Sequence, residues 1–278
     1  MTDFSYLIKN FFVHKDFLVS DKIIPGTFGT PLLFIFESIV IFLAVGSALY
    51  ISKRKDKVKP VLFYVWAVFC VWEVVIVLWD SFASLDKSFD FATNLSLYPC
   101  SIYLYAMPLV FRGGKKAQKM AYGYISTLGL LGAVTAFIYP ARLIDYSCIS
   151  FAGFHTLFYH GAMLFTFLSV MLSHMHSYRG ISRWQDLFYA SVPGLLLSIP
   201  ANIINYSHIN SDYMYFTGQF TLISQRFPNI SKPKFTLIIY ALYIIIPSLF
   251  YLPSYLCNLL SHFKIRYEEN KILAENMG

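Results

Sequence analysis

Charged residues are scarce in this sequence. They make up 13% of the 278 residues, whereas they make up about a quarter of an ordinary soluble domain. Apolar residues account for 57% of the chain and gather in long blocks. Blocks of that length and composition are typical of helices that cross a lipid bilayer. The composition therefore excludes an ordinary soluble domain and predicts a polytopic, all-α membrane protein.

Cysteine is also sparse, and its spacing excludes two common uses. The four cysteines contain no CxxC pair and no paired metal-ligand spacing: Cys70, Cys100, Cys148 and Cys257. A disulfide framework and a structural zinc site are therefore not expected. His155 and His160 are five residues apart, so they point about 140° away from each other on a helix. We expect neither a metal nor a diffusible cofactor.

The net charge of +7 does not predict a nucleic-acid partner, because the basic residues are spread over short loops. With seven membrane crossings, 8 of the 22 Lys and Arg residues fall on the side of the N-terminus and 14 on the other side. The positive-inside rule then places the N-terminus outside and the C-terminal tail in the cytoplasm. Clusters at 53–55 and 112–119 are the strongest cytoplasmic anchors.

Seven apolar blocks are each near the length of about 20 residues that a crossing helix needs. We expect one integral membrane domain over 1–278, with a seven-helix bundle over 31–260 and a cytoplasmic tail over 261–278. No cleavable signal peptide is expected, because residues 4–18 are too polar. Residues 4–12 show one apolar helical face, which predicts either an interfacial amphipathic helix within the segment 1–30 or a short helix packed on the loops. The blocks are 32–52, 61–80, 94–111, 120–139, 151–173, 187–206 and 236–260.

Polar residues inside these blocks gather in one leaflet. With this orientation, five of the expected spans place such residues in the outer half of the membrane: Glu37, Glu73, Cys100, His160, and Asn202 with Asn205. Cys100 lies about 9 Å and His160 about 15 Å from the outer ends of their blocks, at 1.5 Å per residue. Ionisable groups in hydrocarbon persist where they face a bundle interior or a wet cavity. This cluster is the main functional signal in the sequence.

Cys100 is the candidate nucleophile of this cluster. Pro99 precedes it, and proline suits the first turn of a helix. Backbone N–H groups near such a start lack partners, so they favour a thiolate and can hold a developing oxyanion. His160 is the candidate general base and acid, with His155 as its rival. The alternative is that Cys100 is a small apolar residue in a buried helix.

Four short segments resemble a known family. They are "LSLYPCSIYLY", with Cys100 at the cysteine of the family, "GAVTAFIYP" at 132–140, "FHTLFYHGAML", where His160 falls at the key histidine, and "NIINYSHINSDYMYF". In this order and spacing they resemble the YwaF-like integral membrane proteins, a family that includes the animal ether-phospholipid acyltransferase transmembrane protein 164. The resemblance spans roughly residues 30–260. The sequence departs from the family pattern at Ser96, Tyr98, Pro99, Ala141 and Asp212.

The resemblance implies acyl transfer between membrane lipids through a cysteine thioester. Cys100 would accept an acyl chain from a phospholipid donor with help from His160, and a lysophospholipid or water would then accept the chain. We expect Glu73, Asn202 and Asn205 to orient the histidine or to bind the headgroup. Tyr98 and Tyr213 are expected to line the cavity wall.

Three other functions remain open from the sequence. The same Cys/His pair serves a lipid hydrolase if water is the acceptor. A small-solute transporter could place Glu73 in its path, and Pro193 and Pro200 predict a kink in the sixth block. The Gly- and Ala-rich face of 122–136 could also bind a partner helix. The sequence does not indicate an oligomeric state.

Overall fold

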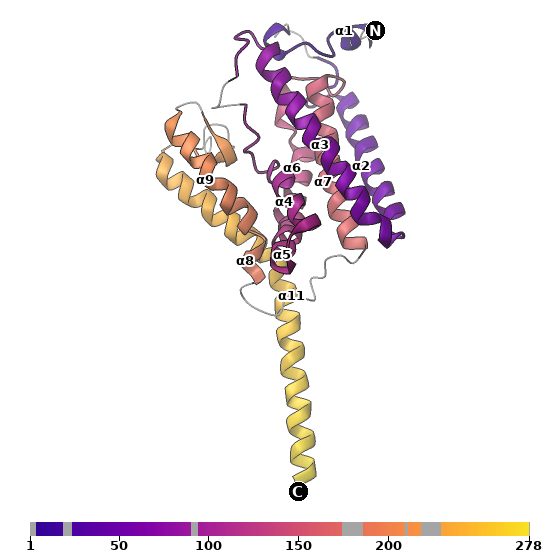
Figure 1. Ribbon diagram of the computed structural model, residues 1–278, viewed down its shortest axis with the longest axis vertical. Helices are drawn as coiled ribbons and strands as arrows, with labels where there is room; N and C mark the ends of the chain where they lie inside the picture. Colours follow the sequence, from indigo (N-terminus) through magenta and orange to yellow (C-terminus); the bar gives the residue numbers. More distant parts are fainter. Residues whose placement is uncertain are drawn as a thin grey trace.

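The computed structural model describes residues 4–18, 24–89, 94–173, 186–208, 211–217 and 229–277. All regular secondary structure in these ranges is helical, and they contain no strand (Figure 1). The all-α prediction is therefore confirmed for the described part of the chain.

Five helices are long and apolar enough to cross a membrane. The first, second and fourth are α2 (Pro31–Ser52), α3 (Lys55–Ala83) and α7 (Phe151–Leu172). The third covers Lys115–Ile144 and combines α5 (Lys115–Tyr124), a π-helical turn η2 (Ile125–Gly129), α6 (Leu130–Ile138) and the 3-10 turn η3 (Ala141–Ile144). The fifth is the apolar part of α11, Lys232–Pro253. These helices support a multi-pass membrane protein.

The third and sixth apolar blocks form shorter helices than the sequence predicts. In the third, only α4 (Ile102–Arg112, 11 residues) is helical, because residues 94–101 form bends and turns. In the sixth, α9 (Val192–Ser207) has 16 residues and begins with a proline in its first turn, while a separate four-residue helix, α8 (Asp186–Tyr189), precedes it. The expected seven full-length crossings are therefore not confirmed.

The N-terminal segment folds over one end of the bundle and forms only short helical turns (Figure 1). The helix α1 (Phe4–Lys9) has six residues, and a 3-10 turn η1 (Lys15–Phe17) follows it. The backbone N–H of Phe151 donates to Phe11 O at 2.8 Å, and that of Cys148 donates to Gly26 O at 2.7 Å. The predicted interfacial amphipathic helix is not confirmed.

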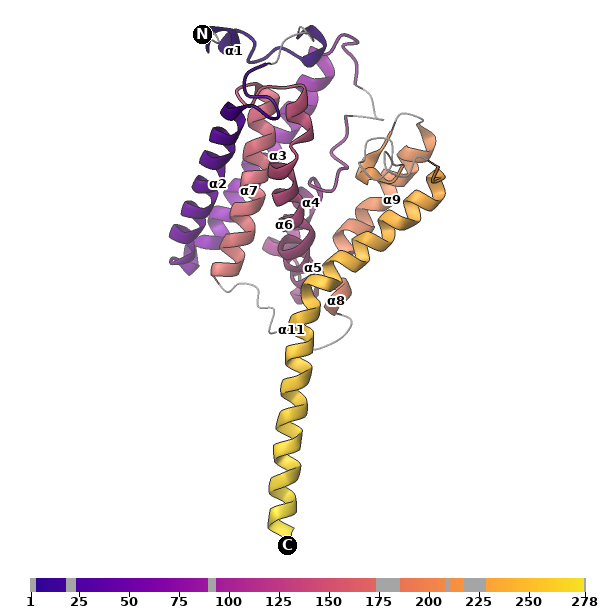
Figure 2. The same cartoon turned by 180° about the vertical axis from the view of Figure 1, so that it is seen from behind.

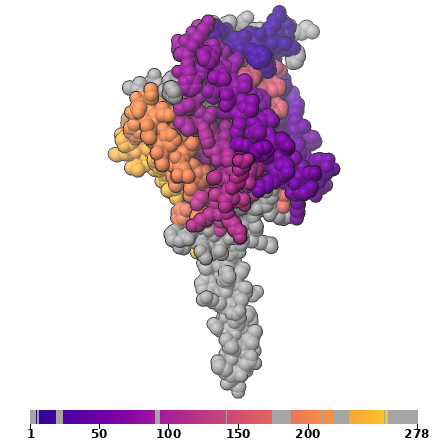
Figure 3. All heavy atoms as spheres, in the orientation of Figure 1, coloured from indigo at the N-terminus to yellow at the C-terminus, as the bar shows by residue number. Residues whose placement is uncertain are grey.

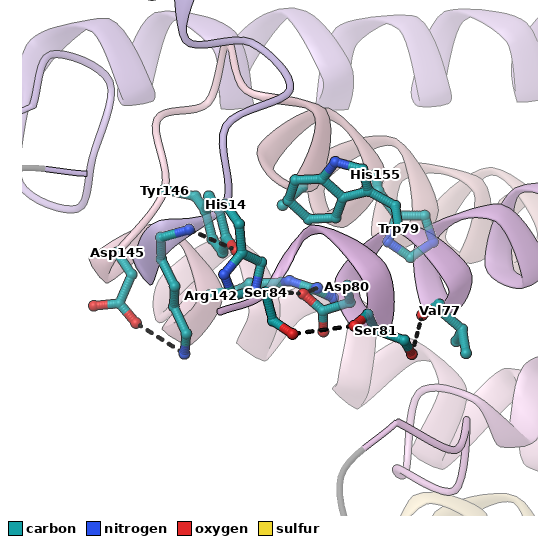
Figure 4. A network of polar contacts seen from close by, with 12 residues as sticks. His14, Val77, Trp79, Asp80, Ser81, Ser84, Arg142, Asp145, Tyr146 and His155 are labelled. Atoms are coloured by element: carbon teal, nitrogen blue, oxygen red, sulfur yellow. Dashed lines mark hydrogen bonds and ion pairs between the residues drawn. The ribbon is translucent and has the colours of Figure 1, made fainter. Parts of the chain in front are cut away.

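Ionic contacts join this segment to α3. Asp80 Oδ1, near the end of α3, lies 3.3 Å from His14 Nε2 and 3.1 Å from Arg142 Nη2. Figure 4 shows both side chains turned toward Asp80. His14 is buried, whereas the side chains of Asp80 and Arg142 are each about one third exposed. Lys15 Nζ pairs with Asp145 at 3.7 Å in a more exposed position.

The helix α7 lies at the centre of the bundle and has the most buried span. It packs closely on α2 at Gly161, where an added Cβ would lie 2.5 Å from Val40 Cγ1. On the face drawn in Figure 3, α9 lies on one side of the molecule and α2 and α3 lie on the other, with residues 94–124 between them. The helix α11 (Lys232–Met277) continues past the expected boundary at residue 260 and leaves the bundle as one rod (Figures 1 and 2).

Candidate active site

Cys100 lies at the start of α4, at the end of the irregular stretch 94–101. The helix begins at Ile102, and Ser101 is its N-cap residue. The N–H of Ser101 donates to Tyr98 O at 3.0 Å, and the N–H of Tyr103 donates to Cys100 O at 3.1 Å. The N–H and hydroxyl of Ser101 also face the Cys100 sulfur. The thiol therefore sits at the positive end of the α4 dipole, as the sequence predicts.

Tyrosine hydroxyls hold this irregular stretch in place. Tyr124 donates to Pro99 O at 2.9 Å, and Tyr159 donates to Cys100 O at 3.3 Å. On the outer side of the cysteine, the N–H of Leu95 donates to the Tyr213 hydroxyl at 2.8 Å. Three elements distant in the sequence therefore bind the backbone around Cys100, namely α5, α7 and the loop 211–217.

The depth of Cys100 follows from Tyr159. This tyrosine is eight residues into α7, or about 12 Å along the helix axis. Irregular backbone at such a depth is tolerated only where protein buries it or where it lines a water-filled cavity. Cys100 keeps some exposed surface, whereas Ser101 is 3% and Ile102 0% exposed. The cysteine is thus partly exposed, while the two residues after it are buried.

Aromatic side chains dominate the surroundings of the Cys100 thiol. Five tyrosines are close enough to interact with it electrostatically: Tyr98, Tyr124, Tyr159, Tyr215 and Tyr243. Their rings supply apolar surface around the thiol, and their hydroxyl groups supply polar atoms. Such a combination suits a ligand that is largely hydrocarbon and carries a few polar atoms.

Glu73 links α3 to the cysteine stretch and to α7. Its Oε1 accepts a hydrogen bond from the Ser96 hydroxyl at 2.6 Å, and its Oε2 lies 2.9 Å from His155 Nε2. The Trp72 ring lies edge-on to the His155 ring, with centroids 5.6 Å apart. Glu73 therefore partners a histidine, as the sequence suggests, but this histidine is His155, the rival base.

Two buried nitrogen atoms beside Glu73 have no hydrogen-bond partner. They are Nε1 of Trp72 and Nδ1 of His155. Because unpaired buried polar atoms are costly, they are expected to meet a ligand or a water molecule. Polar groups without a hydrogen-bond partner among the described residues therefore lie next to the irregular stretch 94–101.

His160 is held in one orientation by its own helix. Its Nδ1 lies 2.7 Å from the Thr156 carbonyl oxygen. A carbonyl only accepts, so this contact assigns the proton to Nδ1 and leaves the lone pair on Nε2. Among the described residues, no hydrogen bond joins His160 to the Cys100 thiol. The two are connected through Tyr159, whose ring lies edge-on to His160 at 5.7 Å.

The two predicted asparagines belong to different networks. Asn205 is 0% exposed and binds the Tyr213 backbone twice, through Tyr213 O and Tyr213 N, both at 2.8 Å. Since the Tyr98 and Tyr213 rings are in contact at 5.3 Å, Asn205 reaches the cysteine stretch through the loop 211–217. Asn202 instead donates to Tyr240 at 2.8 Å, on α11.

The sequence reasoning missed Tyr124 and Tyr159, which fix the backbone around Cys100. Tyr124 precedes the π-helical turn η2, and such turns often occur at functional sites. For Tyr159, the feature of the sequence that points to a role is its position next to His160. Within the described ranges, no group of three or more His, Cys, Asp or Glu side chains could hold a metal ion.

Comparison with known proteins places the chain in a family. Residues 27–257 match the model of the TMEM164 family. Neither the curated proteins nor the solved structures contain a match. The matched range covers most of the chain and includes the cysteine stretch, α7 and the loop 211–217. The chain therefore belongs to the TMEM164 family.

Proposed function

We propose that this chain is an intramembrane lipid acyltransferase. It moves a fatty acyl chain from a phospholipid donor to a lysophospholipid acceptor through a thioester on Cys100. His160 is the general base and acid, while Glu73 and Asn205 are positioning residues. Tyr98 and Tyr213 line the wall of the cavity, and Asn202 supports α9 through Tyr240.

One observation carries the proposal. A cysteine with exposed surface lies before a helix N-terminus, about 12 Å deep along α7, and side chains of three distant elements hold its backbone in an irregular conformation. Maintaining such backbone in a membrane is costly. The irregular backbone is accounted for if it positions a nucleophile where lipid ester groups can reach it.

The first half-reaction forms the thioester. His160 Nε2 takes the proton of the Cys100 thiol, and the sulfur attacks the ester carbonyl carbon of the donor. The negative charge that develops on the carbonyl oxygen is stabilised by the positive end of the α4 dipole. The C–O bond then breaks, His160 returns the proton to the departing glycerol oxygen, and a lysophospholipid leaves.

The second half-reaction restores the cysteine. The free hydroxyl of the acceptor lysophospholipid gives its proton to His160 and attacks the thioester carbon. The C–S bond breaks, and the thiolate takes the proton back. A closer approach of His160 to Cys100 is required, and catalytic hydrogen bonds often shorten only when substrate is bound.

The proposed topology determines which acyl donor can reach Cys100. We place the N-terminus outside and the tail in the cytoplasm, with α4 plus its preceding coil and α9 as two short crossings between the five long ones. Cys100 then lies in the outer leaflet, where phospholipids are present and acyl-coenzyme A is not. Membrane phospholipids and lysophospholipids are the partners, and no cofactor takes part.

The test is the intact mass of purified protein after incubation with a phosphatidylcholine or phosphatidylethanolamine of defined chains. We expect a hydroxylamine-labile gain of one acyl chain, absent in Cys100→Ala and strongly reduced in His160→Ala. Cys148→Ala is the matched control, because the Cys148 side chain is 0% exposed and packs in a core cluster separate from the Cys100 site. A folded protein that forms neither adduct nor lyso-product would overturn the proposal.

A hydrolase using the same groups is the second candidate. It shares the first half-reaction, and water replaces the lysophospholipid in the second. The polar atoms without partners on Trp72 and His155 favour a water-accessible site. Free fatty acid as the main product, even with excess lysophospholipid, would establish hydrolysis.

A further inference from the structure

A groove lies on the lipid-facing side of the bundle and shares no lining residue with the Cys100 site. Its volume is about 440 Å³, within the range of small-molecule sites. The walls come from α2, α6 and α7. The lining includes Phe34, Glu37, Ile41, Val134, Phe137 and Leu164.

The groove is formed by the packing of three helices. Figure 2 shows α7 between α2 and α6, so α7 forms the back of the groove. Gly161 lets α2 approach α7 closely at Val40, and Leu164 lies one turn further along α7. A close helix contact directly behind the cavity keeps its shape defined without a ligand.

One carboxyl oxygen of Glu37 has no hydrogen-bond partner among the residues that the structure describes. The residue is 7% exposed, and its Oε1 is buried without a hydrogen bond. A buried acceptor without a donor costs about 1–3 kcal/mol. Since the same residue lines the cavity, a ligand in the groove can supply the missing donor.

The open side of the groove faces the bilayer. Phe34 is 57% and Ile138 71% exposed, on helices that cross the membrane, so a ligand enters from the lipid. Glu37 lies six residues into α2, or about 9 Å along its axis. At this depth, a hydrogen-bond donor on the glycerol of a lipid can reach Glu37 more easily than a donor on a headgroup above the phosphate.

The lining also indicates an uncharged ligand. It contains no Lys, Arg or His, and Ser38, its one other polar residue, already donates to Phe34 O at 2.7 Å. A phosphate would find no cation there and would lie near the Glu37 carboxyl group. Charged phospholipids are therefore poor occupants.

We propose that this groove binds an uncharged lipid with a free glycerol hydroxyl, of the monoacylglycerol or diacylglycerol class. The hydroxyl donates a hydrogen bond to Glu37 Oε1, and an acyl chain lies against Ile41 and Leu164. The proposal does not depend on acyl transfer, because neither Cys100 nor His160 lines the groove.

The experiment uses full-length protein in phosphatidylcholine nanodiscs and a photoreactive, alkyne-tagged monoacylglycerol as probe. Unlabelled 1-oleoylglycerol competes with the probe in one arm, and its dimethyl ether, which has no hydroxyl, competes in the other. A single intramembrane hydrogen bond of about 1–2 kcal/mol predicts that oleoylglycerol competes roughly tenfold better. The labelled peptides should come from α2 and α6.

Three variants test whether the probe binds in this groove and through Glu37. Glu37→Leu should abolish the tenfold difference between the competitors, and Val134→Trp should fill the groove and remove labelling. Ile35→Trp is the matched control, since Ile35 is exposed on α2 outside the groove and 56% accessible. Equal competition in the wild type, labelling that survives Val134→Trp, or cross-linking only to a second copy of the chain would each overturn the proposal.

Discussion

At the scale of single residues, the two histidines of α7 have different chemical environments. His155 faces the Glu73 carboxylate at 2.9 Å, whereas His160 is bound to the Thr156 carbonyl oxygen. A histidine tied to a buried carboxylate contributes to the stability of the bundle. A histidine whose Nε2 carries a lone pair is prepared to accept a proton.

This difference predicts different effects of substitution. His160→Ala should lower acyl transfer by about 10²–10⁴-fold, the usual contribution of a general base, and leave the melting temperature nearly unchanged. His155→Ala should lower the melting temperature, because it leaves Glu73 buried without its partner. His155→Gln, which can still donate to Glu73, should recover much of that stability. Thermal unfolding and turnover measured on the same preparations check this, and wild-type turnover in His160→Ala would contradict it.

At the scale of helices, close packing of α2 on α7 depends on one glycine. A Cβ at Gly161 would meet Val40 Cγ1 at 2.5 Å, a distance that real Cβ atoms do not show. Small residues at such crossings let helix backbones approach each other in a membrane. Glycine at 161 therefore decides how near α2 lies to α7.

A double-mutant cycle tests this contact. Gly161→Val should force the two helices apart and destabilise the protein by about 1–3 kcal/mol, as overpacking usually does. Val40→Ala should restore part of the loss, because it removes the atom that the new side chain meets. The measurement is thermal or denaturant unfolding of the two single variants and the double variant. Strictly additive effects would show that the two residues are not in contact.

At the scale of the whole molecule, the N-terminal segment closes one end of the bundle through Asp80. This carboxylate holds His14 of the segment and Arg142 of the loop before α7. Figure 4 shows the three side chains together. The contact joins three parts of the chain that no single helix connects.

Asp80→Asn should therefore loosen the segment. Limited proteolysis of the protein in nanodiscs should cut before residue 30 faster in this variant than in wild type, while the membrane bundle stays intact. Asp145→Asn is the matched control, because its pair with Lys15 is about half exposed on both sides and such pairs contribute little. Equal cutting rates in Asp80→Asn and wild type would rule out this role of Asp80.

The sequence by itself determined the class of the protein, because a chain this apolar can bury its blocks only in a membrane. It also predicted that backbone N–H groups near Cys100 lack helical partners, since Pro99 either begins a helix or breaks one. These conclusions depend on neighbouring residues alone.

Tertiary structure decided which distant groups meet. Only the packing of α3 on α7 could choose His155 rather than His160 as the partner of Glu73, because both lie on the same helix and sequence spacing does not orient α7. The same holds for Tyr124 and Tyr159, whose hydroxyls replace helical hydrogen bonds around Cys100. The shortened third helix follows from those contacts. Backbone groups that form hydrogen bonds with side chains inside the membrane do not need helical hydrogen bonds.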